Sequence, residues 1–438
     1  MSAPLPYSCG SADHLTRRTL LQAAGATGLC WLTPLAERLA RAAEDAPRGK
    51  PAKSLIVLWM AGGPSQLETF DPHPKSPIAH EETKAIDTRA KGIQIADSLP
   101  LIAEQMDHIS LVRSLVSKEG DHERATYTVK TGFRPDPTLI HPSLGSILCH
   151  QTTDNCEIPR HVSILPGQWP ARGGFLGDQF DAFKTFDPNG PIPDVIPRVP
   201  EARATRRLDA LQNVVESSFA RGRLKDLDKK TLHATSIAAA RKMMSSDQLK
   251  AFDVSLAPES LRQEFGDNRF GRGCLAALQL IGVGVRCVEV TLDGWDTHFE
   301  NERSVRANCA QLDPAFAALL KHLKERELLD STIVLWAGEF GRTPRRNPNN
   351  GRDHWPHGFT VALGGGGIRG GRVIGETSPD PKLSETDRLQ DLTDPHNIDD
   401  IHATVLRALG IDFTVEHMTP IGRPMALSKG KVIDELLA

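Results

Sequence analysis

Acidic and imidazole side chains follow two apolar strand patterns, and their types and spacing could hold a divalent metal. Residues 288–292 form a run of apolar and β-branched residues, and Asp296 and His298 lie just beyond its end. A second run, residues 332–336, leads to Glu339. In open α/β sheets ligands bind at the carboxyl ends of the strands, so these side chains should meet at one edge. Carboxylates and imidazoles there could coordinate a metal or act as a general acid and base.

Two more histidines, His354 and His357, follow Asp353 in a short segment that also contains tryptophan and proline. Such a group arises by chance in many sequences, and it gains weight here because it follows the two strand ends. All of these side chains could be ligands of a divalent metal. Their types do not distinguish Zn²⁺, Ca²⁺ and Mg²⁺. The predicted metal ligands are Asp296, His298, Glu339, His354 and His357.

The catalytic candidates are three adjacent residues, His122, Glu123 and Arg124, at the predicted start of a helix. A helix N-terminus favours an anion, and an arginine can pair with a sulfate or phosphate oxygen. His122 could be a nucleophile, a general base for water or a further metal ligand. Thr126 is the alternative nucleophile.

Two further residues are predicted to contact the substrate. Ser65 follows the turn at 62–64, whose glycines are most simply explained by a tight turn and less simply by a phosphate cradle, since no P-loop lysine follows. Arg342 lies shortly after the second strand pattern, where its guanidinium could pair with an anionic ester.

The composition is that of an enzyme-sized globular protein. The chain has 438 residues, of which 39% are hydrophobic and 24% charged, enough for one large core and a smaller appended unit. The formal net charge of −3 gives no polycationic surface, so nucleic acid is not an expected partner.

Residues 1–42 are predicted to be a twin-arginine signal peptide. Arg17 and Arg18 precede a weakly apolar run, and Ala40 and Ala42 form a cleavage candidate. The run is too short for a stable membrane span, so none is expected in the mature protein. An amphipathic N-terminal helix is the alternative. The signal predicts the twin-arginine export machinery as a partner and a periplasmic or extracellular location.

Strand and helix patterns alternate along the rest of the chain, which predicts an α/β fold with a mostly parallel central sheet flanked by helices. A linker at 43–53 leads to an N-terminal part of the domain at 54–187, in which helices are expected from Gln66 and at 99–106. Residues 188–270 begin with prolines and continue with polar helix-forming residues, which predicts a helical insertion. Residues 271–438 complete the domain.

The motifs also resemble a known family, the domain of unknown function 1501, within the alkaline phosphatase and sulfatase superfamily. The resemblance is carried by residues 62–65, 294–298, 338–342 and 353–354, and by the aspartate-led helix pattern at 400–411. It implies an alkaline phosphatase/sulfatase-like fold with metal ligands after the first strand and after two late strands.

The chain departs from that superfamily at three positions. Sulfatases have asparagine or histidine where this chain has Phe340, which cannot bind a metal. No aspartate directly follows the first strand, so Glu68 or Asp71 would have to replace it. Aligned on Thr131 and Gly132, the position of the sulfatase nucleophile falls on His122. The resemblance therefore disfavours a cysteine-type sulfatase mechanism.

Two functions follow as expectations. The first is an exported metal-dependent hydrolase of phosphate or sulfate esters, acting on a small-molecule or glycan ester. The second is a catalytically silent protein that uses the same fold to bind sulfated or phosphorylated glycans or other anionic ligands.

Overall fold

The computed structural model describes most of the chain after the predicted signal segment. The described residues are 50–76, 84–153, 156–193, 195, 197–211, 213, 217, 232–384 and 386–438. The predicted signal peptide, residues 1–42, and most of the predicted linker, residues 43–53, lie outside them, so both stay predictions. None of the described helices combines the length and the apolar character that crossing a membrane requires.

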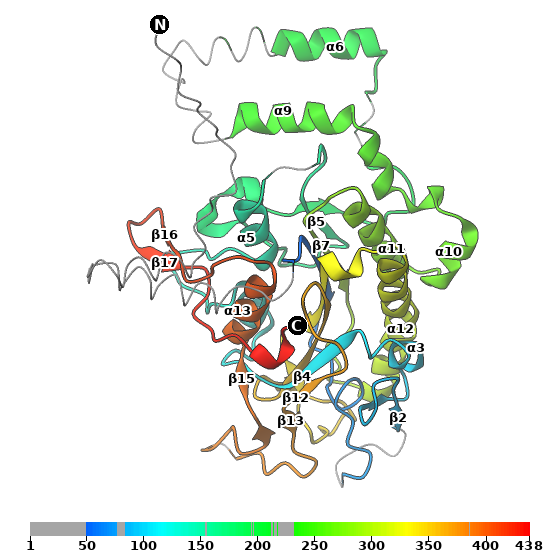
Figure 1. Ribbon diagram of the computed structural model, residues 1–438, viewed down its shortest axis with the longest axis vertical. Helices are drawn as coiled ribbons and strands as arrows, with labels where there is room; N and C mark the ends of the chain where they lie inside the picture. The colour runs from blue at the N-terminus through cyan, green and yellow to red at the C-terminus, as the bar shows by residue number, and fades with distance from the viewer. Residues whose placement is uncertain are drawn as a thin grey trace, which may run out of the picture. The chain divides into compact units, whose positions relative to one another are not determined.

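A nine-stranded sheet forms the centre of the described chain (Figure 1). Its order is β12, β4, β11, β8, β1, β7, β5 and β6, and β15 also pairs with β4. In that order the strands are Val373–Ile374, Ile109–Val116, Phe359–Gly365, Thr332–Gly338, Ser54–Met60, Cys287–Leu292, His161–Ile164 and Phe183–Thr185, with β15 at His396–Asn397. All neighbours are parallel except β11, which is antiparallel to β4 and β8. The predicted α/β class with a mostly parallel sheet is confirmed.

Strand β1 is apolar after Ser54 because both faces of the sheet are covered. Ile56 and Leu58 point into one core cluster, and Leu55 and Trp59 point into the other. One face is covered by α3 (Pro100–Ala103), α11 (Arg269–Gly282) and α12 (Asn301–Glu325), and the other by α4 (His122–Thr131), α5 (Leu144–Gln151) and α13 (Ile398–Ala408). Figure 1 shows α13 on the opposite side of the sheet from α11 and α12.

Smaller elements complete the described fold. The two-stranded ribbons are β2 (Ala85–Asp87) with β3 (Gln94–Ala96), β9 (Gly341–Arg342) with β10 (His354–Trp355), β13 (Glu376–Thr377) with β14 (Leu392–Thr393), and β16 (Glu416–Met418) with β17 (Pro424–Ala426). Short 3-10 helices are η2 (Gly174–Leu176), η3 (Asp178–Phe180), η7 (Leu329–Ser331) and η8 (Asp434–Leu436).

Helix α4 begins directly after its N-terminal capping residue, Asp121. Asp121 is extended, and its carboxylate accepts a hydrogen bond from the Arg124 backbone N–H, which satisfies one free donor of the first turn. Gly132 ends the helix in the left-handed conformation, at φ 76°. The helix therefore presents His122 in its first turn.

The helix predicted from Gln66 is absent from the described segment, and the helix predicted at 99–106 is shorter than expected. The segment after Ser65 forms turns, because the Gln66 amide bonds the main chain of Arg342 on both sides: its Nε2 donates to the carbonyl at 2.9 Å and its Oε1 accepts from the N–H at 2.9 Å. This pairing with a distant loop replaces the local helical bonds. The second helix shortens to the four residues of α3.

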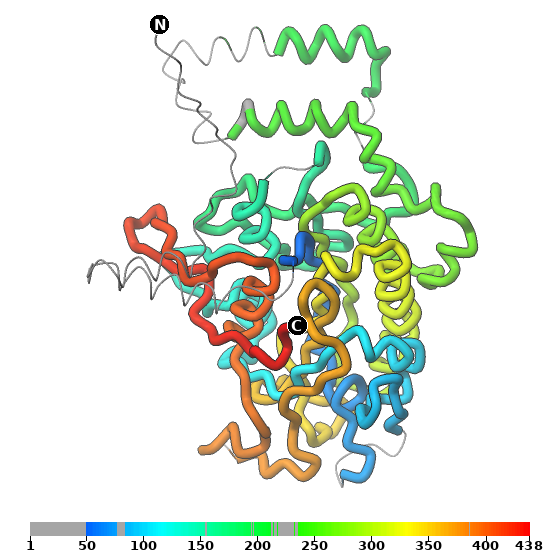
Figure 2. The backbone as a smooth tube through the Cα atoms, in the orientation of Figure 1, coloured from blue at the N-terminus to red at the C-terminus, as the bar shows by residue number. Residues whose placement is uncertain are grey.

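The described part of residues 188–270 is helical, with α6 (Glu201–Ala210), α9 (His233–Met244), η5 (Asp247–Phe252), η6 (Val254–Leu256) and α10 (Glu259–Glu264). Figure 2 shows the backbone running from α9 through α10 into α11. Phe252, Val254 and Phe265 are buried in the same core cluster as α11 and α12. The later half of this segment is thus built into the main core.

His402, on α13, predicts a loss of stability in mild acid. It is fully buried, and burial lowers the pKa of its imidazole from 6.5 to about 4, although Nε2–H donates to the Val129 carbonyl at 2.8 Å. The unfolded chain therefore binds this proton at a higher pH than the folded one. Stability is lost as the pH falls from about 6.5 to about 4, by about 3 kcal/mol in total. Urea unfolding across this range measures the loss.

The His402→Gln variant isolates that contribution, because glutamine does not titrate. The free-energy gap between wild type and variant should shrink by about 3 kcal/mol between pH 7 and pH 4. A gap that stays constant with pH would contradict the assignment.

Candidate metal centre

Three parallel strands deliver the centre at one edge of the sheet. β7, β1 and β8 are neighbours, and the residues after their carboxyl ends are Asp296, Gly62 and Glu339. The loops are joined directly: the Gly62 N–H donates to Glu339 Oε1 at 2.8 Å, and the Trp295 N–H donates to the Ala61 carbonyl at 3.1 Å. The expected meeting of the strand ends is what the structure shows.

Gly62 and Gly63 allow these loops to approach closely. Gly62 has φ 114°, and a Cβ added there would lie 2.3 Å from the backbone nitrogen of Asp296. Gly63 has φ 79°, and a Cβ would lie 2.5 Å from the ring of Phe340. The turn therefore needs glycine for its backbone conformation and for space.

Arg342 holds the same loops together from beneath. Its side chain is completely buried and donates to the carbonyls of Gly62, Gly63 (2.9 Å) and Trp295 (3.1 Å), and to Asp296 Oδ1 at 2.7 Å. All three guanidinium nitrogens have partners, because Nη1 donates to the carbonyl of Arg352 at 3.1 Å. This arginine, predicted to contact the substrate, instead positions Asp296.

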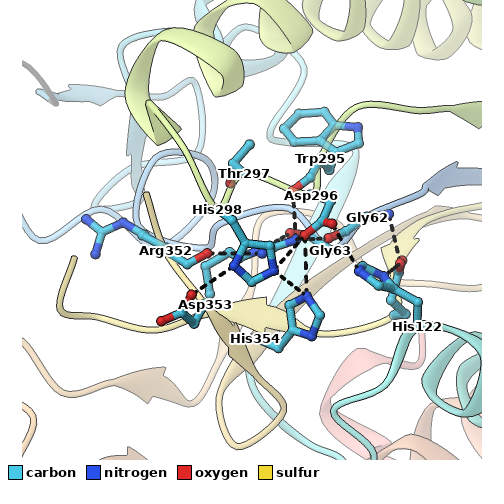
Figure 3. Close-up of polar contacts among 12 residues, drawn as sticks. Gly62, Gly63, His122, Trp295, Asp296, Thr297, His298, Arg352, Asp353 and His354 are labelled. Carbon is cyan, nitrogen blue, oxygen red and sulfur yellow. Dashed lines mark hydrogen bonds and ion pairs between the residues drawn. The ribbon is translucent and has the colours of Figure 1, made fainter. Parts of the chain in front are cut away.

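Three histidines surround the Asp296 carboxylate (Figure 3). His298 Nε2 and His354 Nε2 lie 3.2 Å and 3.3 Å from Oδ1, and His122 Nε2 lies 3.4 Å from Oδ2. His298 Nε2 and His354 Nε2 are 3.0 Å from one another. Ligand atoms of His122, Asp296 and His354 all lie within 4.8 Å of one another, close enough to hold a metal ion, and His298 is not part of this set.

The far side of each ring is occupied by an acceptor. His298 Nδ1 lies 2.8 Å from Asp353 Oδ1, His354 Nδ1 lies 2.7 Å from the carbonyl of Gly120, and His122 Nδ1 lies 2.8 Å from Glu339 Oε1. Carboxylate and carbonyl oxygens only accept, so Nδ1 carries the proton in all three rings. In the neutral rings every Nε2 then presents a lone pair toward Asp296. Histidines that bind metals are oriented in this way.

The environment favours a charged Asp296 and a neutral His354, as a bound cation needs, but it favours protonation of His122. Burial would raise the pKa of Asp296, but the hydrogen bond and charge of Arg342 outweigh it and hold the pKa below its usual value. Burial lowers the pKa of His354, which favours the neutral ring. The hydrogen bond to Glu339 raises the pKa of His122, so this ring takes up a proton more readily.

Glu339, predicted to be a ligand, contacts His122 but is not part of the group of ligand atoms. Its Oε1 accepts from Gly62 N–H and from His122 Nδ1–H, while Oε2 is buried and has no hydrogen-bond partner among the described residues. The side chain is only 2% exposed. Its contacts fit a residue that orients His122.

Other predicted residues lie apart from the centre. His357 Nε2 accepts from Arg388 at 3.0 Å. Ser65 is completely buried in the turn. Glu123 is exposed, and Arg124 already pairs with Glu119 through Nε at 2.7 Å. None of these four belongs to the group of ligand atoms found in the described chain.

The two candidates for the missing first-strand carboxylate are also engaged elsewhere. Glu68 forms a buried ion pair with Arg352 at 2.7 Å. Asp71 accepts from the N–H and the hydroxyl of Thr377, at 3.0 Å and 2.7 Å. Both carboxylates are tied to the loops that frame the site and do not reach the histidines.

Sequence reasoning missed the residues that orient the histidines. Asp353 was seen only as the neighbour of His354, whereas it fixes the His298 ring. The Gly120 carbonyl carries no side-chain signal at all. Asp353 could have been found, because a carboxylate beside a candidate histidine ligand often supports another ligand.

A cavity of about 520 Å³ opens beside the centre. His122, Asp296 and Glu339 line one side of it, and Thr126 and Lys130 continue the wall along α4. Trp59, Trp169, Phe186 and Phe270 also line it. Aromatic residues make up only 5% of the chain, so four in one lining are a marked concentration.

Comparison with known families matches residues 52–437 to a protein family of unknown function, DUF1501. The chain belongs to the DUF1501 family. The match covers nearly all of the described chain and confirms the family predicted from its motifs. A comparison with curated proteins finds no match.

Solved structures similar to this DUF1501 protein include phosphatases and sulfatases. A mutant of TAB5 alkaline phosphatase with magnesium bound is 12% identical, with 83% of this chain and 99% of that chain covered and a TM-score of 0.37. The PsFucS1 sulfatase from Pseudoalteromonas is 13% identical, with 83% and 69% covered and a score of 0.35. The lipoteichoic acid synthase LtaP from Listeria monocytogenes is 11% identical, with 84% and 74% covered and a score of 0.37. Scores this low carry no argument about the activity of this chain.

Gly62→Ala should disrupt the centre of this DUF1501 protein. The added methyl group would overlap the Asp296 backbone and strain a left-handed residue, so the free energy of unfolding should fall by about 2 to 4 kcal/mol. Chemical denaturation measures this loss, and calorimetric titration with Zn²⁺ should show weakened binding.

Gly92→Ala is the matched control for that variant. Gly92 also has a left-handed backbone, at φ 84°, but a Cβ there meets nothing within 4 Å. It should lose only about 1 kcal/mol and keep its metal affinity. Equal effects of the two substitutions would show that the contact with Asp296 does not matter.

Proposed function

We propose that this protein is a metal-dependent hydrolase of phosphate or sulfate esters. The observation that carries the proposal is the convergence of the Nε2 atoms of His122, His298 and His354 on the Asp296 carboxylate. His298 Nε2 and His354 Nε2 are 3.0 Å apart, and each Nδ1–H is already used. A cation bound here would have both Nε2 atoms and Asp296 Oδ1 as ligands.

Asp296, His298 and His354 are the proposed ligands, and His122 is either a fourth ligand or the group next to the reacting ester. Imidazole with carboxylate suits Zn²⁺ and related first-row metals better than Ca²⁺ or Mg²⁺, which prefer oxygen. When bound, such an ion supplies Lewis acidity that polarises a phosphoryl or sulfuryl oxygen.

The protein's own residues provide orientation and proton transfer. Glu339 accepts from His122 Nδ1–H at 2.8 Å, so Nε2 is the atom left to exchange a proton at the cavity wall. Thr126 lies one turn further along α4, is 2% exposed and lines the same cavity. Its hydroxyl is the alternative nucleophile.

Phe340 has a part in this proposal although it cannot bind a metal. Its buried ring stacks on His354, with centroids 4.3 Å apart, and its centroid is 5.0 Å from that of His122. An aromatic wall behind two imidazoles excludes water and restricts ring rotation. The departure from the sulfatase pattern is thus compatible with a working site.

The proposed location is outside the cytoplasm, in the periplasm or beyond. Arg17 and Arg18 before a weakly apolar run are the basis of this proposal. The export machinery would then carry the chain as a folded protein.

Metal removal is the first test of the function. The purified protein should contain about one equivalent of a first-row metal by elemental analysis, and chelation should abolish hydrolysis of aryl phosphate or aryl sulfate esters. Asp296→Asn should lose the metal. Asp293→Asn, an exposed carboxylate outside the group, should keep it.

Two outcomes would overturn the proposal. Full ester hydrolysis by metal-free protein would exclude metal dependence. Tight metal-dependent binding of an anionic ester without turnover, across sulfate and phosphate panels, would favour the silent binding protein.

His122→Ala separates the two roles of His122. A group that transfers a proton should cost turnover about a hundredfold or more while metal content changes little. Loss of the metal in parallel with turnover would instead make His122 a ligand. Lys118→Ala, at an exposed position before α4 that lines neither this cavity nor its neighbour, is the control and should change neither.

A further inference from the structure

A second cavity of about 400 Å³ adjoins the first. The two share four lining residues, Thr126, Lys130, Gln168 and Trp169. We call the cavity beside the metal centre the first chamber and the other the second chamber. These shared residues place the two chambers side by side.

Helix α4 forms much of that common wall. His122, Thr126 and Lys130 are spaced by four residues and line the first chamber, so they share one face of the helix. Glu123 and Tyr127, each one position later, line the second chamber. The reacting centre and the second chamber are therefore held in fixed relation by one helix.

The wall between the chambers is fixed by a buried ion pair. Lys130 Nζ donates to Glu289 Oε1 at 2.9 Å and to the Trp169 carbonyl at 3.0 Å, and it lies 4.7 Å from the centre of the Trp59 ring. Both charged side chains are less than a tenth exposed. Lys130 therefore holds Trp169 in place across the helix.

The second chamber combines aromatic surface with free charges. The Tyr127 hydroxyl forms two hydrogen bonds with His141: it lies 2.9 Å from Nδ1 and accepts from the backbone N–H at 2.7 Å. The aromatic ring of Tyr127 is left to contact a ligand. Arg172 and Lys184 are exposed, and within the described chain neither has an ion-pair partner. Two unpaired cations are available for an anion there.

We propose that the second chamber binds a ring of the substrate that carries another anionic group, one unit away from the reacting ester. The inference rests on the proposed hydrolase and specifies its substrate as a saccharide chain with repeated sulfate or phosphate groups. Arg172 and Lys184 contact the second anion, and Trp169 packs against the ring face.

A saccharide fits the lining better than a nucleic acid. Sugar rings have an apolar face that packs on aromatic side chains, and their hydroxyls donate to carboxylates and amides. Glu123 and Gln168 supply such acceptors in this chamber. The net charge of −3 offers no extended basic track for a nucleic-acid backbone.

Calorimetric binding tests the inference without requiring turnover. The probes are galactose oligosaccharides of one to four rings with one sulfate per ring, and the same series with phosphate. Extension from one ring to two should tighten binding about tenfold, the effect of one added charge-assisted hydrogen bond. The stronger series identifies the anion.

Variants assign that gain to the second chamber. The double variant R172A/K184A should remove the tenfold gain and leave one-ring binding unchanged, and Trp169→Leu should reduce it. Lys91→Ala removes an exposed cation outside both chambers and should have no effect. A gain that persists in the double variant, or preferential binding of a single-stranded oligonucleotide, would overturn the proposal.

The two proposals fail separately. If the saccharides bind with this length dependence and neither they nor the aryl esters are hydrolysed, the hydrolase proposal is wrong and the chamber assignment stands. If aryl esters are hydrolysed but no length dependence is found, the chamber assignment is wrong.

Discussion

The buried guanidinium of Arg342 is the interaction on which the rest of the site depends. It binds the backbone carbonyls of the turn after β1 and of the loop after β7, and it pairs with Asp296 at 2.7 Å. A buried arginine cannot lose its proton, so the site retains one fixed positive charge beneath its central carboxylate. That charge keeps Asp296 ionised and in one orientation. The three histidines surround this carboxylate, whose position Arg342 fixes.

Each histidine is held in turn by a different part of the chain. Asp353 fixes His298, the Gly120 carbonyl fixes His354, and Glu339 fixes His122. The loop after β4, the loop after β8 and the N-terminus of α4 must therefore all be in place before the Nε2 atoms converge. The centre is a product of the whole sheet edge and not of one local motif.

The sequence predicted the parts of this arrangement that follow from strand periodicity. The predicted bounds of β1, β7 and β8 lie close to the observed ones. The side chains that follow these strands do meet. A parallel sheet makes this outcome general, because neighbouring strands end at one edge. The sheet class followed from the same patterns, whereas the family came from the resemblance of its motifs.

The sequence could not assign roles that depend on partners distant in the chain. Arg342 resembled an anion-binding residue, but its partners Gly62 and Gly63 lie about 280 positions earlier. Glu68 resembled a ligand until its pairing with Arg352 was seen. In both cases the residue type was informative, and tertiary packing decided what it binds.

The central place of β1 has a consequence for biosynthesis. This strand is the first in the described chain, yet its neighbours β7 and β8 are made much later, and the bond from Gly62 to Glu339 spans 277 positions. This apolar strand therefore remains unpaired until most of the polypeptide has left the ribosome. Such delayed pairing is slow and exposes sticky surface, so we expect nascent chains to need chaperone protection. A truncated chain that ends before β8 would have neither a complete sheet nor a complete metal site.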